Sequence, residues 1–155
     1  MAQARDVVAI DLDAIFGELN KQHSGPKLRE AESFARMLLG RLPPDELTGQ
    51  SAADWAGMCS HLLRLFRDRP RGQSLVRVYN PSRDEHGYEC AHTVIEILND
   101  DMPFLVDTVA MVVAQHGGLV HLTLHPVVPV ARDPGGHVLS FGGNEAGRES
   151  VIHLQ

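Results

Sequence analysis

Apolar residues recur at helical spacing through the first part of the chain. In residues 8–19 and 28–42 they return every three or four positions, which places them along one side of an α-helix. Ser24-Gly25-Pro26 separates the two segments, and Pro43-Pro44 ends the second. The pattern predicts two helices, with apolar positions Val8, Leu12, Ile15, Phe16 and Leu19 in the first and Leu28, Ala31, Ala35, Leu38, Leu39 and Leu42 in the second.

A third helix is predicted to begin at Ser51. Ser51 and Asp54 have the spacing of a capping box, with Asp54 in the place of the usual Glu or Gln. Four arginines gather near the end of this helix, where positive charges interact favourably with the helix dipole and are exposed to water. Its apolar side consists of Trp55, Met58, Cys59, Leu62, Leu63 and Phe66, and the arginines are Arg64, Arg67, Arg69 and Arg71.

From residue 75 onward the apolar period changes to two, which is typical of β-strands. A single helix is predicted among the strands, at residues 102–116, with Gly117-Gly118 closing it. Its inward positions are Leu105, Val109, Val112 and Val113. Strands are predicted at residues 75–80, 91–99, 119–131, 137–141 and 149–155, with a loop at 81–87 that allows a hairpin and a turn at 133–136.

The order of these elements indicates an α+β chain with two parts. Residues 1–74 form a helical segment, and residues 75–155 contain a β-α-β-β arrangement. A split β-α-β sandwich of the ferredoxin-like kind has a second helix and a fourth strand. We therefore expect an incomplete sandwich, truncated at its C-terminal end, with one sheet face that lacks part of its cover and meets a partner chain.

The net charge of −6 is unevenly distributed along the chain. Residues 1–74 hold ten basic and ten acidic side chains, whereas residues 75–155 hold four and ten. Nucleic acid is therefore not expected as a partner, because phosphate binding needs a basic surface. The sequence contains no run of about 18 apolar residues, so no membrane span is expected. Acidic residues interrupt the N-terminal stretch, so it is not a signal peptide, and two cysteines indicate the cytoplasm.

One long motif carries a family resemblance. Asn99-Asp-Asp-Met-Pro-Phe-Leu-Val-Asp107, followed by Thr108-Val109, resembles the N-terminal region of the large bacterial NAD-specific glutamate dehydrogenases. Three further motifs recur in the same order in that family, so the resemblance spans about residues 51–155. They are Val76-Arg-Val-Tyr-Asn-Pro81, His92-Thr-Val-Ile-Glu96 and Val120-His-Leu-Thr-Leu-His-Pro126.

The resemblance implies a very large subunit that oxidatively deaminates L-glutamate to 2-oxoglutarate with NAD. Several regulatory-type modules precede the catalytic domain in that family. The first of them resembles an ACT fold, the amino-acid-sensing form of the β-α-β-β-α-β sandwich. Residues 75–155 are then an incomplete ACT-like sandwich in a homo-oligomer, and its expected partners are later domains of the same chain and other subunits.

The residues themselves argue against catalysis within this chain. A dinucleotide site needs G-x-G-x-x-G between a strand and a helix, and the glycines of residues 142–147 have the wrong spacing and no helix after them. The family chemistry also implies a lysine that activates water, but the only lysines are Lys21 and Lys27 in the helical segment. We expect no catalytic residue and no cofactor here, with NAD bound elsewhere in the parent enzyme.

A ligand-binding loop is implied after the second predicted strand. ACT modules hold their ligand at a D-x-P-G-L-type sequence, which Asp101 to Leu105 matches except that Phe104 replaces glycine. A helix N-terminus offers N–H groups to a carboxylate, whereas a phenyl ring would fill that space. Asp100 and Asp101 would repel the carboxylate of an amino acid and receive its ammonium. The candidate residues are Asn99, Asp100, Asp101, Met102, Pro103, Phe104 and Leu105.

A purely structural interpretation of the same loop stays open. Asp100 or Asp101 would cap the helix, with Pro103 in its first turn. The chain would then be a scaffold or oligomerisation module, with an edge strand or sheet face against another subunit or a later domain. The alternative is an allosteric module whose amino-acid effector discriminates two states of the enzyme. Phe104 separates the two, because a filled loop favours the scaffold.

Histidines and cysteines are not expected to form a reactive site. His121 and His125 share a face of a predicted strand, but four residues at ~3.3 Å each place them ~13 Å apart. One zinc with ~2 Å bonds cannot bridge that distance. Cys59 lies on an apolar helix face, and Cys90 has no adjacent Lys or Arg, only His92 on the same strand face. We expect neither a metal site nor a catalytic thiol.

Overall fold

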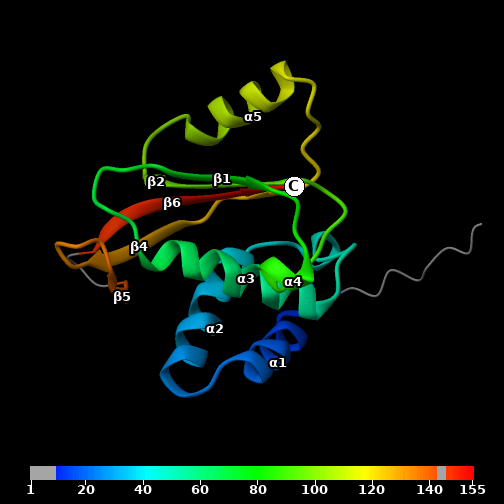
Figure 1. Cartoon of the computed structure of the whole chain (residues 1–155), viewed down its shortest axis with the longest axis vertical. Coiled ribbons are helices and arrows are strands. Elements are labelled where there is room, and N and C mark those ends of the chain that lie inside the picture. Colours follow the sequence, from blue (N-terminus) through cyan, green and yellow to red (C-terminus); the bar gives the residue numbers. More distant parts are fainter. Residues whose placement is uncertain (1–9, 143–145) are drawn as a thin grey trace, which may run out of the picture. The chain divides into compact units, whose positions relative to one another are not determined.

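The computed structural model describes residues 10–142 and 146–155. It has the predicted α+β fold, with helices first and then an antiparallel sheet that has helices between its strands (Figure 1). Val8, assigned above to the first helix, lies outside the described residues. The helices are α1 (Leu12–Gln22), α2 (Gly25–Leu39), the short 3-10 helix η1 (Pro44–Glu46), α3 (Ala52–Arg67), α4 (Arg83–His86) and α5 (Leu105–Gln115). The strands are β1 (Leu75–Tyr79), β2 (Val94–Asp100), β3 (Thr123–Leu124), β4 (Val127–Arg132), β5 (Val138–Phe141) and β6 (Gly147–Leu154).

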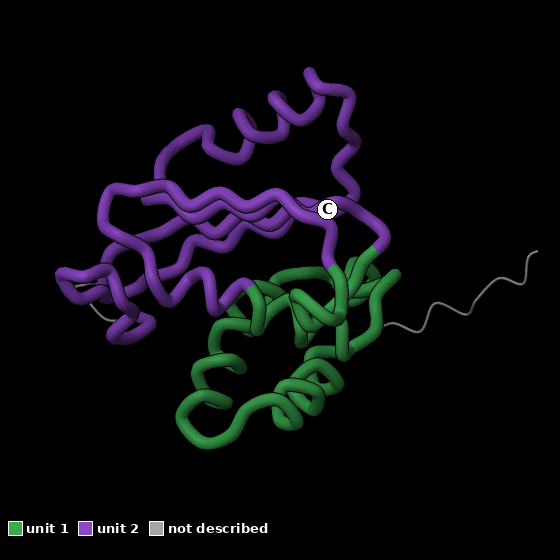
Figure 2. The backbone as a smooth tube through the Cα atoms, viewed as in Figure 1, with its two compact units in different colours: residues 1–61, 82–90 green, residues 62–81, 91–155 purple. Residues whose placement is uncertain are grey.

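The chain divides into two compact units, drawn in different colours in Figure 2. Unit 1 contains the described residues up to His61 together with residues 82–90. Unit 2 contains residues 62–81 and the described part of 91–155. The units divide within α3, whereas the domain boundary at residue 74, where the apolar period changes, stays a prediction.

Unit 1 is built from α1, α2, the first turns of α3, and α4. One of the two bonds of the predicted capping box is confirmed, because the N–H of Asp54 donates to Ser51 Oγ at 3.1 Å, and the Ser51 hydroxyl donates to Asp54 Oδ2. Asp54 Oδ1 also accepts from the N–H of Glu89 at 3.1 Å, so the same carboxylate holds the segment after α4. The buried apolar side chains of this unit are Ile15, Leu19, Ala31, Phe34, Ala35, Leu38, Leu39, Leu47, Trp55, Ala56, Met58, Cys59 and Tyr88.

Unit 2 contains one antiparallel sheet with the strand order β1-β2-β6-β4-β5. β6 is its central strand, because it pairs with β2 along one side and with β3 and β4 along the other. α5 lies against one face of this sheet (Figure 1), where Ile97, Ile152 and Leu154 form a buried cluster. Around that cluster pack Ile95, Leu105, Val106, Val109 and Val113.

β1 forms one edge of the sheet. It pairs antiparallel with β2, with Val76 opposite Ile97 and Val78 opposite Ile95, and α4 lies in the connection. Directly opposed side chains share a face of the sheet, so Val76 and Val78 lie on the α5 side. They are 60% and 63% exposed. The expected sandwich therefore has an additional edge strand, and its sheet has an apolar strip without cover.

The long strand predicted at residues 119–131 is wrong in its first part. The structure has two strands there, β3 and β4, and both pair with β6. Pro126 lies between them and has no N–H to give to the ladder. Its carbonyl oxygen accepts from the N–H of Val151 at 3.1 Å. Residues 119–122 precede β3 and belong to no strand.

α5 differs from its predicted form at its start and on its buried side. It begins at Leu105 and not at residue 102, and Val106 packs on the sheet in place of Val112, which is 45% exposed. Leu105, Val109 and Val113 are spaced four residues apart, so the stripe that faces the sheet extends to Val106 and excludes Val112. The predicted end is confirmed, because Gly117 has a φ of 80°. Among the described helices none is long and apolar enough to cross a membrane.

Candidate functional site

The candidate loop, residues 99–105, leaves the end of β2 and enters α5. Asn99 and Asp100 are the last residues of β2 and are held by neighbours on other segments. Asn99 Oδ1 accepts from Ser74 Oγ at 2.7 Å, and Asp100 Oδ1 accepts from Arg69 Nη2 at 2.8 Å. The Asn99 amide nitrogen also donates to Met102 Sδ at 3.7 Å, so Asn99 links the end of β2 to the loop before α5, whereas Asp100 is directed at Arg69.

Neither aspartate caps α5, so the capping interpretation is wrong. Asp101 Oδ1 accepts from Ser150 Oγ at 3.0 Å, and Oδ2 lies 3.8 Å from Arg148 Nε. The main-chain N–H of Asp101 donates to the carbonyl oxygen of Arg148 at 3.0 Å. β6 thus holds Asp101 on both sides, which a local capping pattern could not reveal. The residue at the cap position of α5 is Phe104, which makes no side-chain capping hydrogen bond.

Phe104 takes the backbone conformation that a glycine would favour. Its φ is 64° and its ψ is 10°, and it is the non-glycine residue with positive φ among the described residues. The ring is 77% exposed, so the expectation that it fills the loop is wrong. Met102 is 48% exposed beside it, whereas Leu105 packs on the sheet. Asp100, Asp101 and Leu105 contact residues outside the loop, so the loop does not gather its side chains around one point.

A buried cluster of charges lies beside the candidate loop, and the sequence patterns did not predict it. Glu149 on β6 accepts from Arg132 Nε at 2.8 Å and Arg132 Nη2 at 2.9 Å, and lies 3.0 Å from Arg69 Nη1. Arg69 also reaches Asp100. All three of Arg69, Arg132 and Glu149 are at most 8% exposed. The cluster ties β2, β4 and β6 to the end of α3.

A second buried network contains Glu96 at its centre. Glu96 pairs with Arg77 across the β1–β2 ladder and accepts from Tyr79 Oη at 2.9 Å. Its Oε1 is also 3.1 Å from His153 Nδ1, and His153 Nε2 is 3.1 Å from the side-chain nitrogen of Gln155. Burial by itself would raise the pKa of Glu96. The hydrogen bond and charge of His153, and then those of Arg77, outweigh burial and hold this pKa below its ordinary value.

We expect the Glu96→Gln variant to lose part of the acid sensitivity of folding. Because the folded pKa lies below the ordinary value of 4.5, the carboxylate stabilises the fold above about pH 4.5. That stabilisation disappears as the pH falls through the lowered pKa. Urea denaturation at several pH values between about 3 and 7 gives the unfolding free energy at each pH. As the pH is lowered, this free energy should fall more steeply for the native protein than for Glu96→Gln. Glu85→Gln, on the exposed α4, serves as the control, and equal slopes for all three proteins would contradict the expectation.

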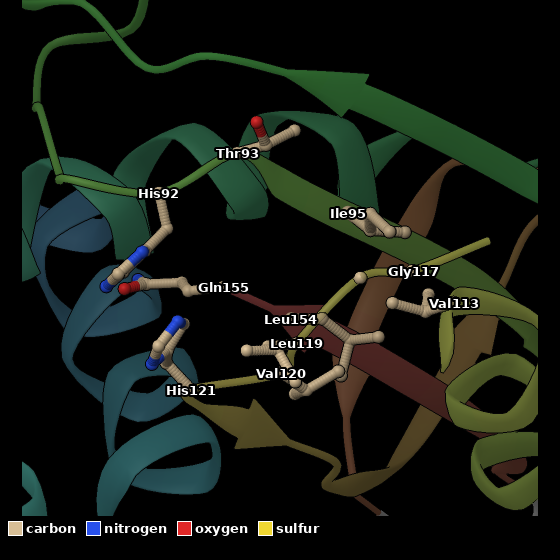
Figure 3. Close-up of a pocket in the computed structure, with 11 residues that line it drawn as sticks. His92, Thr93, Ile95, Val113, Gly117, Leu119, Val120, His121, Leu154 and Gln155 are labelled. Carbon is tan, nitrogen blue, oxygen red and sulfur yellow. The ribbon is translucent and has the colours of Figure 1, made fainter. Parts of the chain in front are cut away.

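A pocket of about 440 Å³ opens at the other end of α5. It lies within unit 2, where α5 ends, β2 begins and β6 ends (Figure 3). His92 and His121 stack face to face, with 4.2 Å between ring centroids and 15° between ring planes. Figure 3 shows these rings with Gln155 at one end of the pocket, and apolar side chains at the other. The apolar members are Ile95, Val113, Leu119, Val120 and Leu154.

The sheet topology brings the two histidines together. β2 and β3 both run antiparallel to β6, and Leu154 pairs with Ile95 on one side and Thr123 on the other. His92 and His121 each lie two residues before the first residue of their strand, so both lie where β2 and β3 begin. The sequence analysis missed this pair because it placed His121 inside a strand beside His125. The matching offsets before two strands that run in the same direction are the signal that could have revealed it.

His125 and Cys59, two further candidates for metal or thiol chemistry, are accounted for by their surroundings. No group of three or more potential metal ligands occurs within residues 10–142 and 146–155. His125 Nε2 lies 3.2 Å from Ser150 Oγ, apart from the histidine stack. Cys59 is fully buried, and burial raises the pKa of its thiol to about 12, so it is not a thiolate at neutral pH.

Comparison with known proteins gives the family. Residues 34–155 match the family model of the glutamate dehydrogenase ACT1 domain. The chain belongs to this family. An NAD-specific glutamate dehydrogenase of Pseudomonas aeruginosa is 35% identical over 140 residues, which are 86% of this chain and 9% of that protein. A protein of the same name from Halomonas elongata is 33% identical over 107 residues, 69% of this chain and 7% of that protein. No solved structure was found to match.

The ACT1-family chain spans less than a tenth of the length of these curated relatives. The relatives are named NAD-specific. Every strand pair in the described sheet is antiparallel, and a dinucleotide crevice forms at the carboxyl ends of parallel strands. The glycine motif at residues 142–147 falls partly outside the described residues.

Proposed function

We propose that this chain is an N-terminal, non-catalytic module through which a large cytoplasmic NAD-specific glutamate dehydrogenase is assembled. The parent enzyme would convert L-glutamate, NAD and water to 2-oxoglutarate, ammonium and NADH. Support comes from the ACT1 family membership and from relatives more than ten times as long as the matched region. The free cysteines, Cys59 and Cys90, are in keeping with a reducing compartment.

The observation that carries this proposal is an uncovered apolar surface on the α5 side of unit 2. We define the outer face as Val76 and Val78 on β1 with Met111 and Val112 on α5, which are 45–63% exposed. α5 contains one charged residue, Asp107, and none of its residues is buried. A helix that is apolar on nearly all sides is normally buried. We therefore infer that another part of the full enzyme covers the outer face.

The sensor role has less support from the candidate loop. The exposed ring of Phe104 leaves the start of α5 open, which favours a ligand there. Asp101, however, is already bonded to Ser150 and lies near Arg148, and Asp100 is paired with Arg69. An ammonium group would have to compete with these partners for both carboxylates. The assembly role needs no such exchange, so we prefer it.

The assembly proposal is tested by replacing Met111 with lysine in two forms of the protein. In the 155-residue chain, where Met111 is 53% exposed, the unfolding free energy should change by no more than about 0.5 kcal/mol. In the full-length enzyme the lysine would lie in an apolar interface without a partner, which costs several kcal/mol. We expect a lower melting temperature and weaker subunit assembly, measured by calorimetry and analytical ultracentrifugation.

Leu139→Lys on β5 is the matched control, because Leu139 is 67% exposed and lies outside the outer face. It should leave both forms unchanged. If Met111→Lys had no effect on the full-length enzyme, the outer face would be solvent-exposed there and the assembly role would be wrong.

A further inference from the structure

We propose that the outer face is covered by a second copy of this chain, with α5 of each copy lying over β1 of the other. The proposal rests on the assembly role, because it names the partner for the surface on which that role depends. Two copies would form three layers, in which the two α5 helices lie side by side between the two sheets. Each α5 would then contact its own sheet on one side and β1 of the other copy on the opposite side.

The outer face combines two surfaces that are each exposed in unit 2. Val76 and Val78 form a sheet strip, which lies on the α5 side of β1 and is more than half exposed. Met111 lies on the side of α5 opposite the sheet, because it is two residues, or about 200° of helical turn, from both Val109 and Val113, which pack on the sheet. The strip can therefore accept a helix, and α5 can accept a second sheet.

The two surfaces match in length and direction. β1 spans about 16 Å with 5 residues at ~3.3 Å each, and α5 spans about 16 Å with 11 residues at ~1.5 Å each. β1 runs opposite to β2. So does α5, since its end lies beside the start of β2, where Val113 and Ile95 line one pocket. A helix that packs on the strip in the direction of α5 therefore covers β1 from end to end.

Val112 would lie at the contact between the two helices. β2 and β4 both pair antiparallel with β6, so α5 lies in a connection between two parallel strands of one sheet. Such connections are right-handed in nearly all proteins, and this hand directs the Val112 side of α5 toward β1. A two-fold axis along the helices brings Val112 of each copy to the same level, where an interaxial distance of about 8–10 Å allows the two side chains to touch.

The charges of α5 permit a contact between identical surfaces. A two-fold interface requires that a surface fit its own copy, and two-fold dimers are the commonest assemblies of identical chains. Asp107 is the charged residue of α5. The two Asp107 side chains would lie at the same end of the helix layer, at least about 10 Å apart, where a Debye length of ~8 Å weakens their repulsion. The other residues of α5 are uncharged, so no further like charges meet there.

The expected contact area indicates a weak pair in isolation. A helix about 16 Å long and about 10 Å wide would meet one helix and one strip, and the strip contact recurs in the other copy. Counted on both surfaces, these contacts cover roughly 1,000 Å², which is near the lower limit for a specific interface. We therefore expect the 155-residue chain to be monomeric at low micromolar concentration. In the full-length enzyme, other contacts between subunits raise the effective concentration, and the pair should form.

Cysteine cross-linking in the full-length enzyme tests the arrangement. Under mild oxidation Val112→Cys should form a disulfide between two subunits, which a denaturing gel shows as a doubled chain mass. Met111→Cys is the matched control, because its side chain would face the sheet of the other copy and not its α5. It should give at least about tenfold less cross-linked product, since a disulfide needs Cα atoms within about 7 Å. Val112 and Met111 are 45% and 53% exposed in the single chain, so both variants should fold.

A pair of double variants tests the contact between α5 and β1. Val78→Cys combined with Met111→Cys should join two subunits, because Met111 of one copy would lie against the strip of the other. Leu139→Cys combined with Met111→Cys is the control, because Leu139 is exposed on β5 and lies outside the outer face. This control should give no more product of doubled mass than the unmodified enzyme.

The outcomes separate this proposal from the assembly role. If Met111→Lys weakens assembly of the full-length enzyme but Val112→Cys gives no more cross-linked product than the unmodified enzyme, another segment covers the outer face and the second copy is the wrong partner. Equal cross-linking of Val112→Cys and Met111→Cys would also overturn the proposed pairing. If Met111→Lys has no effect on assembly, both proposals are wrong.

Discussion

Replacement of Arg132 by alanine is expected to destabilise unit 2 by about 3–5 kcal/mol, the usual cost of removing one partner of a buried ion pair. Arg132 is 8% exposed and bonds Glu149 through Nε and Nη2. Its guanidinium also donates to the carbonyl oxygens of Phe66 and Gly136, each at 2.7 Å. Alanine would leave the Phe66 carbonyl at the end of α3, the turn after β4 and one side of the Glu149 carboxylate without these donors.

Urea denaturation followed by circular dichroism measures this loss. Arg132→Lys is a second variant that keeps the positive charge. One ammonium cannot reproduce the planar fork that reaches Glu149, Phe66 and Gly136 together, so most of the loss should remain. Arg148→Ala is the control, because Arg148 is 72% exposed and 3.8 Å from Asp101, and it should change stability by less than about 1 kcal/mol. A loss below about 1 kcal/mol for Arg132→Ala would show that the cluster is not needed for stability.

Two helical glycines should respond to alanine in opposite directions. A Cβ at Gly57 on α3 would lie 2.2 Å from the carbonyl oxygen of Gly87 and 2.9 Å from Cβ of Tyr88. Backbone atoms would have to move, so Gly57→Ala is expected to cost about 3 kcal/mol or more. A Cβ at Gly17 on α1 meets nothing within 4 Å. Gly17→Ala should therefore stabilise the protein by about 0.5–1 kcal/mol through helix propensity alone.

Thermal and urea denaturation of both variants provide the measurement. Gly87 ends α4 with a φ of 78°. Its carbonyl group lies directly against Gly57 on α3. The opposite signs are informative, because a uniform effect of alanine in helices would change the unfolding free energy of both variants in the same direction. A stabilising Gly57→Ala would mean that the segment after α4 does not contact α3 as described.

The fold could largely be predicted because its signals are local and periodic. The capping box at Ser51, the glycine end of α5 and the change of apolar period all act within a few residues, and each matches the structure. The errors occurred where distant residues decide. The predicted strand at residues 119–131 is divided at Pro126, and the partner of both parts is β6, which begins more than 20 residues after Pro126 along the chain. Val106 and not Val112 is covered because the sheet, and not the helix, decides which side is buried.

The sequence located the candidate loop between β2 and α5, and its role as a ligand site stays a prediction. The family motif located residues 99–105, but not that Arg69, Arg148 and Ser150 would engage the two aspartates. Those partners lie about 30 to 50 residues away along the chain and follow no spacing rule. The histidine stack was missed for a related reason, because it depends on which strands become neighbours. The buried position of Glu96 also escaped prediction, since strand alternation alone places it on a face without saying what that face meets.

The central position of β6 has a consequence for the time course of synthesis. Ile97 on β2 pairs with Ile152, 55 residues later in the chain. At about 5–20 residues per second, a ribosome needs roughly 3–11 seconds to cover that interval. During this time β2 has its β1 neighbour, but α5 has no Ile152 or Leu154 to pack against. The nascent chain therefore holds an apolar helix and an open strand edge for seconds, and the sheet closes only when its innermost strand arrives last.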